Sequence, residues 1–256
     1  MIEPDSPDFV SSFARGLAVI RSFGAETPRQ TLTEVAERTG MTRAAARRFL
    51  LTLAALGYAH SDGKHYALAP QILELGYSYL SSLSLTEALQ PFLAGVTETL
   101  KESSSAAVLD GADVTYVARS AARHRVIAVN LAIGARLPAH ATSMGQVLLA
   151  HLEPQRLQHF LRTTPLERYT DNTLTDPADL AARLDRVRAQ GWALCDGELE
   201  IGLRSVAVPV RGRDGRVTLA INVSTQASRA SVEALQRDYL SVLQDAAAAF
   251  EKTLHL

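Results

Sequence analysis

The sequence lacks several features that define common protein classes. Its single cysteine, Cys195, leaves no partner for an internal disulfide, so a disulfide framework is excluded and a reducing compartment is expected. No stretch approaches the roughly 18 consecutive apolar residues of a membrane-spanning helix. The acidic, proline-containing residues 1–8 lack the basic and apolar segments of a secretory signal. These absences predict a cytoplasmic protein that does not enter a membrane.

An excess of positive charge is missing as well. The formal net charge is −1, so the chain as a whole gives no sign of nucleic-acid binding, and only a local basic segment can indicate it. Residues 38–61 form such a segment, because they contain four arginines and no acidic residue. With 256 residues, of which 47% are apolar, the chain is long enough for two domains with a sizeable core.

The first part of the chain carries the pattern of a winged helix-turn-helix. After a first apolar stripe at helical spacing, Thr33 and Thr42 are placed to cap two helices, the second running from about residue 43 to residue 56. The apolar period then changes from 3.6 to 2 around Asp62-Gly63, which predicts a hairpin with positive φ at both central residues. This order of elements predicts a winged helix-turn-helix over residues 9–69.

The remaining residues predict a linker and a larger second domain. Apolar residues at helical spacing predict a linker helix over residues 70–84. Residues 85–256 begin and end with helical patterns and contain grouped strand patterns, with a strand expected over 126–131 and a loop over 134–138. Strands grouped in this way indicate an α+β fold with a central antiparallel sheet.

The helix after Thr42 is expected to separate its residues onto two sides. At about 100° per residue, one side is apolar and faces inward: Ala46, Phe49, Leu53 and Leu56. Arginine is the commonest reader of guanine, and small residues let a helix approach the groove floor. The expected DNA-binding residues are Thr33, Thr42, Arg43, Ala44, Arg47 and Arg48, with Lys64 and His65 on the wing. A solvated helix that binds nothing is the alternative.

Several longer runs of sequence resemble the IclR family of bacterial regulators. The similar runs are residues 13–20, 32–36, 47–53, 66–76, 134–145, 202–210 and 220–224. The resemblance covers nearly the whole chain, and within the family it is to the branch that controls aromatic-acid and β-ketoadipate catabolism, the PcaR/PobR type. It implies a GAF-like effector domain over residues 85–256 and a small organic acid as effector. It also implies a homodimer or dimer of dimers on double-stranded DNA with a pseudo-palindromic operator, without cofactor or enzyme activity.

The resemblance also implies which residues line the effector pocket. They are His140, Ser143, Met144, Asp196, Glu198, Ser205, Asn222 and Ser224. The chemistry suits a carboxylate, because Ser143 stands at a helix N-terminus and Asn222 and Ser224 share one face of a strand. Each residue also has a simpler interpretation: Ser143 as a helix cap, Asn222 and Ser224 as cross-strand partners, and His140 as a structural histidine.

Other function classes use some of the same residues. A hydrolase triad of His140, Ser143 and Asp196 is one alternative, but the serine is not in a G-x-S-x-G motif. A metal site at Cys195, Asp196, Glu198 and His140 is another, without the spacing of a Cys/His motif. No Walker-type loop is present. A dimerisation module with a vestigial pocket is a further alternative. The sequence leaves open activation or repression, the operator and the exact effector.

Overall fold

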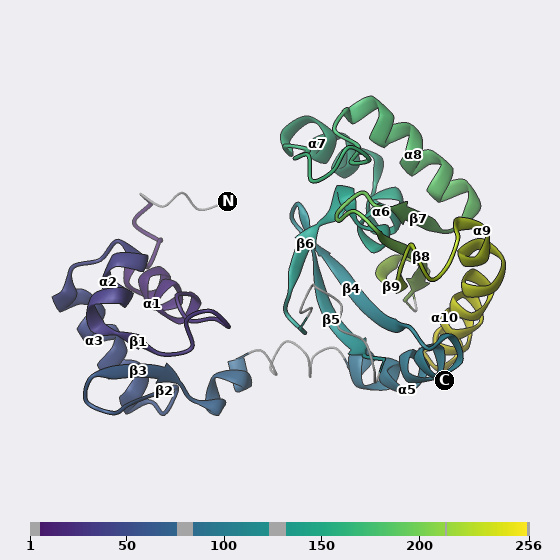
Figure 1. Cartoon of the computed structure of the whole chain (residues 1–256). Coiled ribbons are helices and arrows are strands. Elements are labelled where there is room, and N and C mark those ends of the chain that lie inside the picture. Colours follow the sequence, from purple (N-terminus) through teal and green to yellow (C-terminus); the bar gives the residue numbers. More distant parts are fainter. Residues whose placement is uncertain (1–5, 76–83, 123–131, 213, 255–256) are drawn as a thin grey trace. The chain divides into compact units, whose positions relative to one another are not determined.

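The computed structural model describes residues 6–75, 84–122, 132–212 and 214–254. The chain divides into two compact units, residues 1–83 and 84–256, and each is described by itself (Figure 1). The strand expected over 126–131 and most of the expected linker helix lie outside the described residues, so the division into 9–69, 70–84 and 85–256 stays a prediction. Within the described ranges, no helix is long and apolar enough to cross a lipid bilayer.

The smaller unit is a winged helix-turn-helix. Its elements are α1 (Ser11–Arg21), β1 (Gln30–Thr31), α2 (Leu32–Thr39), α3 (Arg43–Ala55), β2 (Ala59–Ser61), β3 (His65–Leu68) and the 3-10 turn η1 (Pro70–Ile72). The strands form an antiparallel sheet in the order β1-β3-β2. Its core holds the buried side chains Val19, Val35, Ala46, Leu50 and Leu53, so the three helices pack on one another.

Helix α2 begins two residues earlier than the sequence pattern suggested. Thr31 is its N-cap and accepts a hydrogen bond from the Glu34 N–H, while the Glu34 carboxylate accepts one from the Thr31 N–H. This reciprocal capping box satisfies two backbone donors of the first turn. The expectation that Thr33 caps the helix is therefore wrong, and Thr33 lies inside the first turn.

The turn of the wing also differs from the expected one. Gly63 has φ +94°, but Asp62 does not have positive φ. Instead, the Asp62 carboxylate accepts hydrogen bonds from the N–H groups of Lys64 (3.0 Å) and His65 (2.7 Å). The turn is closed by this aspartate side chain, so a positive φ is needed only at the glycine.

The larger unit is built around one antiparallel sheet of six strands. Its helices are α5 (Ser84–Leu100), α6 (Ser143–Ala150), α7 (Pro154–Thr163), α8 (Pro177–Gln190), α9 (Val232–Ala234), the π-helical turn η3 (Leu235–Tyr239) and α10 (Leu240–Leu254), with the 3-10 turn η2 (Ala139–Ala141). Its strands are β4 (Ser103–Asp110), β5 (Asp113–Ser120), β6 (Arg136–Pro138), β7 (Ala193–Asp196), β8 (Leu203–Arg211) and β9 (Val217–Gln226). The strand order is β6-β5-β4-β9-β8-β7. The loop expected over 134–138 is wrong in part, because residues 136–138 pair with β5 at the sheet edge.

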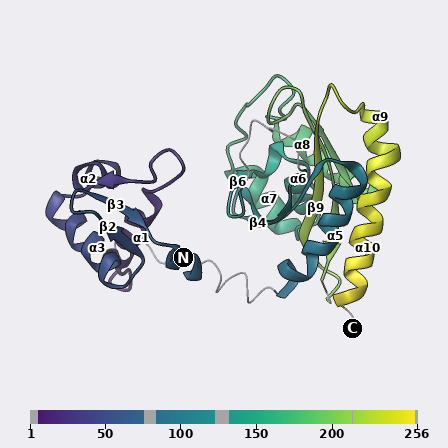
Figure 2. The same ribbon diagram turned by 60° about the horizontal axis from the view of Figure 1, so that its bottom comes forward.

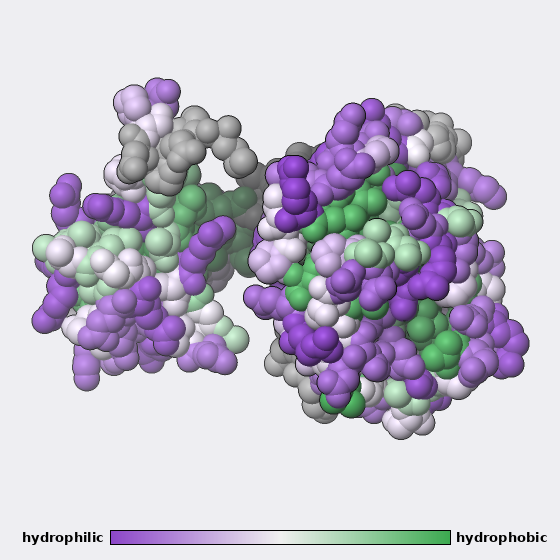
Figure 3. All heavy atoms as spheres, turned by 90° about the horizontal axis from the view of Figure 1, so that it is seen from above, coloured by the Kyte–Doolittle hydropathy of each residue, from purple (hydrophilic) through white to green (hydrophobic). Residues whose placement is uncertain are grey.

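Helices cover both faces of this sheet. Helices α5 and α10 lie side by side on one face, and α6, α7 and α8 lie on the other (Figures 1 and 2). Large side chains such as Val206, Ile221 and Val223 fill the α5–α10 side. Across the visible surface, hydrophilic side chains surround separate apolar areas (Figure 3). The α+β fold with an antiparallel sheet is confirmed.

The two faces of β8 and β9 differ in a way that makes room for a site. Because side chains alternate along a strand, Ala207 and Asn222 point away from the α5–α10 side. Ser205 and Ser224 share this face with them. Small and polar side chains therefore face α6, where a fully packed core would need larger ones.

Candidate functional site

The N-cap and the buried side of α3 follow from its own residues and those next to it. Thr42 is its N-cap and accepts a hydrogen bond from the Ala45 N–H over 3.2 Å, as the sequence indicated. The buried side consists of Ala46, Leu50 and Leu53. Leu50 was not expected there, and Leu56, which was, is 57% exposed. Leu56 is the C-cap residue, one position beyond the end of α3 at Ala55, and its side chain is not part of the buried side.

The polar side of α3 is open. Arg43, Ala44, Arg47 and Arg48 are all exposed. The guanidinium groups of Arg43, Arg47 and Arg48 form no ion pair with any residue in the described part of the chain. An outward cationic helix of this kind can place its N-terminal residues on base edges and its flanking charges on phosphates. The assignment of these residues to DNA stays a prediction.

The wing presents fewer charges than expected. Lys64 is exposed at the turn, while His65 is half-buried on β3 and lies 3.5 Å from the Asp62 carboxylate. Arg29 also pairs with Asp62. The aspartate thus ties the wing tip to the loop before β1, and Lys64 is the side chain best placed to meet a phosphate.

In the larger unit, a cavity lies between the sheet and the N-terminus of α6. Its volume is about 40 Å³. We call this cavity the effector pocket, after the pocket that the family resemblance implies. Its lining comes from the sheet (Ser103, Ser105, Tyr116, Arg119, Leu137, Cys195, Leu203, Ser205, Asn222, Ser224), from the start of α6 and the residues before it (Ala141, Thr142, Ser143) and from the β7–β8 turn (Glu198, Leu199).

Strand register brings the polar side chains into two rows. In one row Ser205 lies opposite Ser224, and Ser224 lies opposite Ser103. In the next row Asn222 lies opposite Ser105, and Ser105 lies opposite Arg119. Directly opposed residues have neighbouring side chains, so hydroxyl, amide and guanidinium groups share one floor.

An irregularity in the β4–β5 pairing adds a second residue of β5 to this floor. The register shifts after Ala106, so that Ala106 faces Ala118 but Ala107 faces Tyr116. An extra residue in one strand changes which side chains share a face. Tyr116 and Arg119 therefore both line the pocket, although strict alternation would place them on opposite faces.

Two polar atoms in the pocket have no hydrogen-bond partner among the described residues: Ser143 Oγ and Asn222 Oδ1. Ser143 is fully buried and Asn222 is 4% exposed. The capping role expected of Ser143 belongs to Thr142, which accepts from the Gly145 N–H over 3.3 Å. Buried polar atoms are nearly always hydrogen-bonded, so these two indicate a place for a polar ligand.

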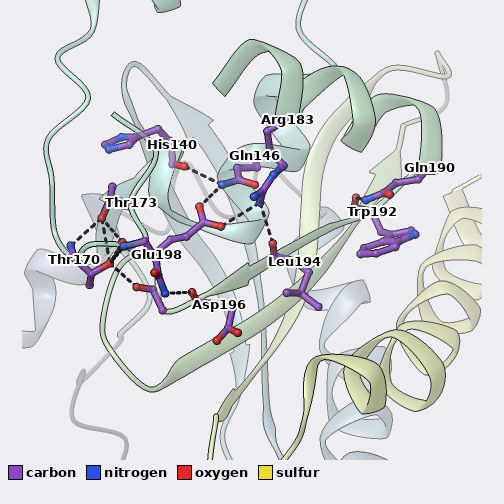
Figure 4. A network of polar contacts seen from close by, with 12 residues as sticks. His140, Gln146, Thr170, Thr173, Arg183, Gln190, Trp192, Leu194, Asp196 and Glu198 are labelled. Atoms are coloured by element: carbon purple, nitrogen blue, oxygen red, sulfur yellow. Dashed lines mark hydrogen bonds and ion pairs between the residues drawn. The ribbon is translucent and has the colours of Figure 1, made fainter. Parts of the chain in front are cut away.

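Glu198 lines the pocket but its carboxylate is bound to the protein. Gln146 Nε2 donates to Oε2 over 2.7 Å and Arg183 donates to Oε1 over 3.1 Å, which joins α6 and α8 to the β7–β8 turn (Figure 4). Burial raises the pKa of Glu198, against the opposing effect of Arg183. Its position therefore depends on a buried network in which its carboxyl group pairs with Arg183.

Three of the expected pocket residues are not among its lining residues. His140 is buried with Nε2 3.0 Å from the Glu167 carbonyl oxygen, and Met144 lies in the core beneath α6. Asp196 points away from Glu198 (Figure 4) and pairs with Arg204 over 2.7 Å. The five others, Ser143, Glu198, Ser205, Asn222 and Ser224, come together in the pocket.

The arrangement does not favour the hydrolase or metal alternatives. A triad requires the histidine to bond the serine, but His140 Nε2 faces a backbone carbonyl and Asp196 pairs with Arg204. Across the described residues, no group of three or more His, Cys, Asp or Glu side chains is placed to hold a metal ion. Cys195 is buried, and burial raises the pKa of its thiol, so it stays a neutral thiol.

Two hydrogen-bond donors at the β5 side of the pocket, the Tyr116 hydroxyl and the Arg119 guanidinium, were not predicted from the sequence. Burial raises the pKa of Tyr116 to about 12, so its hydroxyl stays protonated at neutral pH and can donate. Arg119 is half-buried on the same face. A signal was present in the sequence, since Arg119 at the end of a strand pattern and the run Ser103–Ser105 are both unusual for a core sheet.

Comparison with protein families gives two matches that together span most of the chain. Residues 12–63 match the IclR helix-turn-helix domain. Residues 77–252 match the C-terminal domain of bacterial IclR transcriptional regulators.

Individual relatives match nearly the whole length of the chain. The chain is 46% identical to the Pca regulon regulatory protein of Pseudomonas putida, covering 93% of this chain and 81% of that one. A transcriptional regulator from Rhodococcus sp. RHA1 has a similar structure, with a TM-score of 0.88, 48% identity and coverage of 96% and 99%. An IclR homologue from Microbacterium hydrocarbonoxydans, solved in complex with 4-hydroxybenzoate, has a TM-score of 0.86 at 26% identity and coverage of 95% and 99%.

Proposed function

The chain belongs to the IclR family of bacterial transcriptional regulators, and from that premise we propose that a small organic acid controls its operator binding by occupying the effector pocket. The observation that carries this proposal is that Ser143 and Asn222 both line the cavity and that each holds a buried polar atom, Oγ and Oδ1, without a hydrogen-bond partner in the described structure. An acid that bonds them removes a cost of roughly 1–3 kcal/mol per buried unsatisfied group.

Several groups of the pocket suit a carboxylate. Arg119 can form a charge-assisted hydrogen bond, and the Tyr116 hydroxyl is a neutral donor beside it. The backbone N–H groups at the start of α6 favour negative charge in the same way. An aromatic acid is the leading class, because the Microbacterium relative binds 4-hydroxybenzoate and the P. putida relative regulates the pca genes.

DNA contact is assigned to the exposed side of α3 and to the wing. Arg43, Arg47 and Arg48 supply the positive charge, and Ala44 leaves space for close approach to the bases. The caps at Thr31 and Thr42 stabilise the first turns of α2 and α3.

Pairing of two chains is assigned to α1. Its stripe of exposed apolar side chains includes Val10, Phe13 and Leu17, of which Phe13 is 68% exposed. A contiguous exposed apolar stripe is typical of an interaction surface, and a two-fold pair would place two α3 helices on a pseudo-palindromic operator. Sedimentation velocity of Phe13→Glu tests this: a lighter species than the wild type supports pairing through α1, and an unchanged one contradicts it.

The test of the whole proposal is operator binding by the full chain with and without acid. Fluorescence anisotropy with DNA from the chain's own promoter should give a specific complex whose affinity changes by about 5- to 150-fold when the acid is present, the usual range of allosteric coupling. The Ser143→Ala, Asn222→Ala double variant should bind the DNA but lose this response. If it responds at the wild-type acid concentration, the effector does not bind at these residues.

A further inference from the structure

The loop between α7 and α8, residues 164–176, holds the turn between β7 and β8 at three consecutive backbone positions (Figure 4). Three of its side chains donate hydrogen bonds to the carbonyl oxygens of residues 196, 197 and 198, in that order: Asn172 over 3.0 Å, Thr170 over 2.6 Å and Thr173 over 2.6 Å. The backbone of the turn is therefore fixed by side chains that come from a different part of the chain.

The Thr173 hydroxyl uses its whole hydrogen-bonding capacity in this contact. While it donates to the turn, its oxygen accepts from the N–H groups of Tyr169 over 3.0 Å and Thr170 over 2.8 Å. A hydroxyl group has one proton and two lone pairs, so all three are occupied. Thr173 is 5% exposed and Thr170 is 9% exposed. Because the site is buried, an apolar side chain of the same shape would leave several polar backbone groups without a partner.

The turn held in this way forms part of the effector pocket. Glu198 and Leu199 are among the lining residues, whereas no residue of the segment 170–173 is among them in the described structure. The Glu198 carboxyl group is bound by Gln146 of α6 and by Arg183 of α8. Both the side chain and the backbone of Glu198 are thus held, and the segment 170–173 reaches the pocket only through the backbone.

The same loop also contacts the residues before α6. The Glu167 carbonyl oxygen lies 3.0 Å from His140 Nε2, and the rings of Tyr169 and His140 have their centroids 5.9 Å apart. His140 belongs to η2, and the next three residues, 141–143, line the pocket. One loop therefore joins two walls of the pocket, the start of α6 and the β7–β8 turn, although the segment 170–173 lies outside the lining.

We infer that Thr170, Asn172 and Thr173 are positioning residues for acid binding, which act on the effector pocket through the backbone of the β7–β8 turn. Side chains behind a binding site determine how precisely its lining is held, and loss of such a contact costs about 10- to 100-fold in affinity at metal sites. The inference rests on the proposed function and adds to it residues that set the affinity without touching the acid.

Two substitutions of Thr173 test this in calorimetric titrations of the full chain. The probe is whichever of 4-hydroxybenzoate, benzoate and adipate binds the wild type most tightly. Thr173→Val keeps the shape of the side chain but removes the hydroxyl, and affinity should fall about tenfold. Thr173→Ser keeps the hydroxyl and should bind within about twofold of the wild type. Thr175→Val is the matched control and should leave affinity unchanged, because the Thr175 hydroxyl accepts from Arg168 within the loop itself, over 3.2 Å.

Urea unfolding of the same variants separates positioning from a merely structural role. A structural role alone would lower the unfolding midpoint of Thr173→Val and leave the acid affinity of the folded protein at the wild-type value, which overturns the inference. An equal loss of affinity in Thr173→Val and Thr173→Ser overturns it too, because the hydroxyl would not be the cause. Absence of wild-type binding to all three acids overturns the proposed function together with the inference.

Hydrogen exchange of the wild type, read by mass spectrometry, needs no folded variant. The amides of Tyr169 and Thr170 are bound to Thr173 Oγ1, so their exchange reports on this contact. Because coupling between two sites is reciprocal, acid in the pocket should slow exchange at these amides as well as in the turn 197–202. Protection of the turn with unchanged exchange at Tyr169 and Thr170 would show that the loop does not respond to the pocket, and the inference would be wrong.

Discussion

Gln146 donates a hydrogen bond to the buried carboxylate of Glu198 over 2.7 Å, and this contact joins the first turns of α6 to the turn between β7 and β8. The same amide group donates to the His140 carbonyl oxygen over 3.0 Å. One glutamine thus connects the segment before α6, the helix itself and the acidic wall of the pocket. The position of Ser143, one turn earlier on α6, depends on this connection.

The Glu198 carboxylate should make stability depend on pH. Its pKa is raised in the folded protein, chiefly by burial, so folding favours the protonated form. The stabilising contribution is present below the pKa of the unfolded chain, about 4.3, and is lost as pH rises through the folded-state pKa. The wild type should therefore lose stability relative to Glu198→Gln as pH rises above about 4.3.

Urea unfolding followed by the fluorescence of Trp192, the single tryptophan and a residue of the larger unit, measures this difference. Because both proteins share every other titratable group, the difference isolates Glu198. A wild type that gains stability over the variant as pH rises would contradict the stated direction.

Gly145 should not tolerate a side chain. A Cβ at this position would lie 2.1 Å from the Ala139 carbonyl oxygen, which is backbone and cannot swing aside. Gly145→Ala should therefore destabilise the larger unit by about 1–3 kcal/mol and weaken acid binding, because the start of α6 must move.

Gly95 provides the matched control within the same unit. It is an exposed glycine of α5, and a Cβ there meets nothing within 4 Å. Gly95→Ala should stabilise the unit by roughly 0.5–1 kcal/mol through helix propensity. Trp192 fluorescence in urea reports both changes, and equal stabilities for the two variants would show that the close approach to Ala139 is not a constraint.

Thr31, not Thr33, should control the stability of α2. Thr31→Ala removes the capping box with Glu34 and should cost about 1 kcal/mol. Thr33→Ala is the control, since its hydroxyl makes no capping bond. Hydrogen exchange of the α2 amides, read by mass spectrometry, should accelerate in the first variant only. The opposite ranking would restore Thr33 as the cap.

Arg47 should contribute to DNA affinity without affecting the effector. Arg47→Ala should weaken specific operator binding by about 1–3 kcal/mol if the side chain reads a base. Fluorescence anisotropy measures this, and calorimetry should give unchanged acid binding. Arg186→Ala, an exposed arginine of α8, is the control for loss of charge alone. Identical operator affinities for Arg47→Ala and wild type would remove Arg47 from the interface.

The sequence predicted those features of the fold that are caused by residues close together in the chain. The cap at Thr42, the outward arginines of α3 and the end of α8 at Gly191 with φ +80° follow from neighbouring residues, and they were predictable. Leu50 is buried and Leu56 is exposed, unlike the predicted pattern, because the end of a helix depends on packing as well as on periodicity. Asp196 does not line the pocket as predicted, because its carboxylate pairs with Arg204 of the adjacent strand.

The sequence by itself determined the order of elements, the α+β class and a cationic helix free to meet DNA. Each of these is set by residues within a turn or two of one another. Only the tertiary structure decided which polar groups meet around the effector. Ser105 lies opposite Asn222, which is distant in the sequence, because β4 and β9 pair in one register. Tyr116 shares a face with Arg119 because the register shifts once between β4 and β5. Strand register is fixed by packing over the whole sheet, and no local pattern records it.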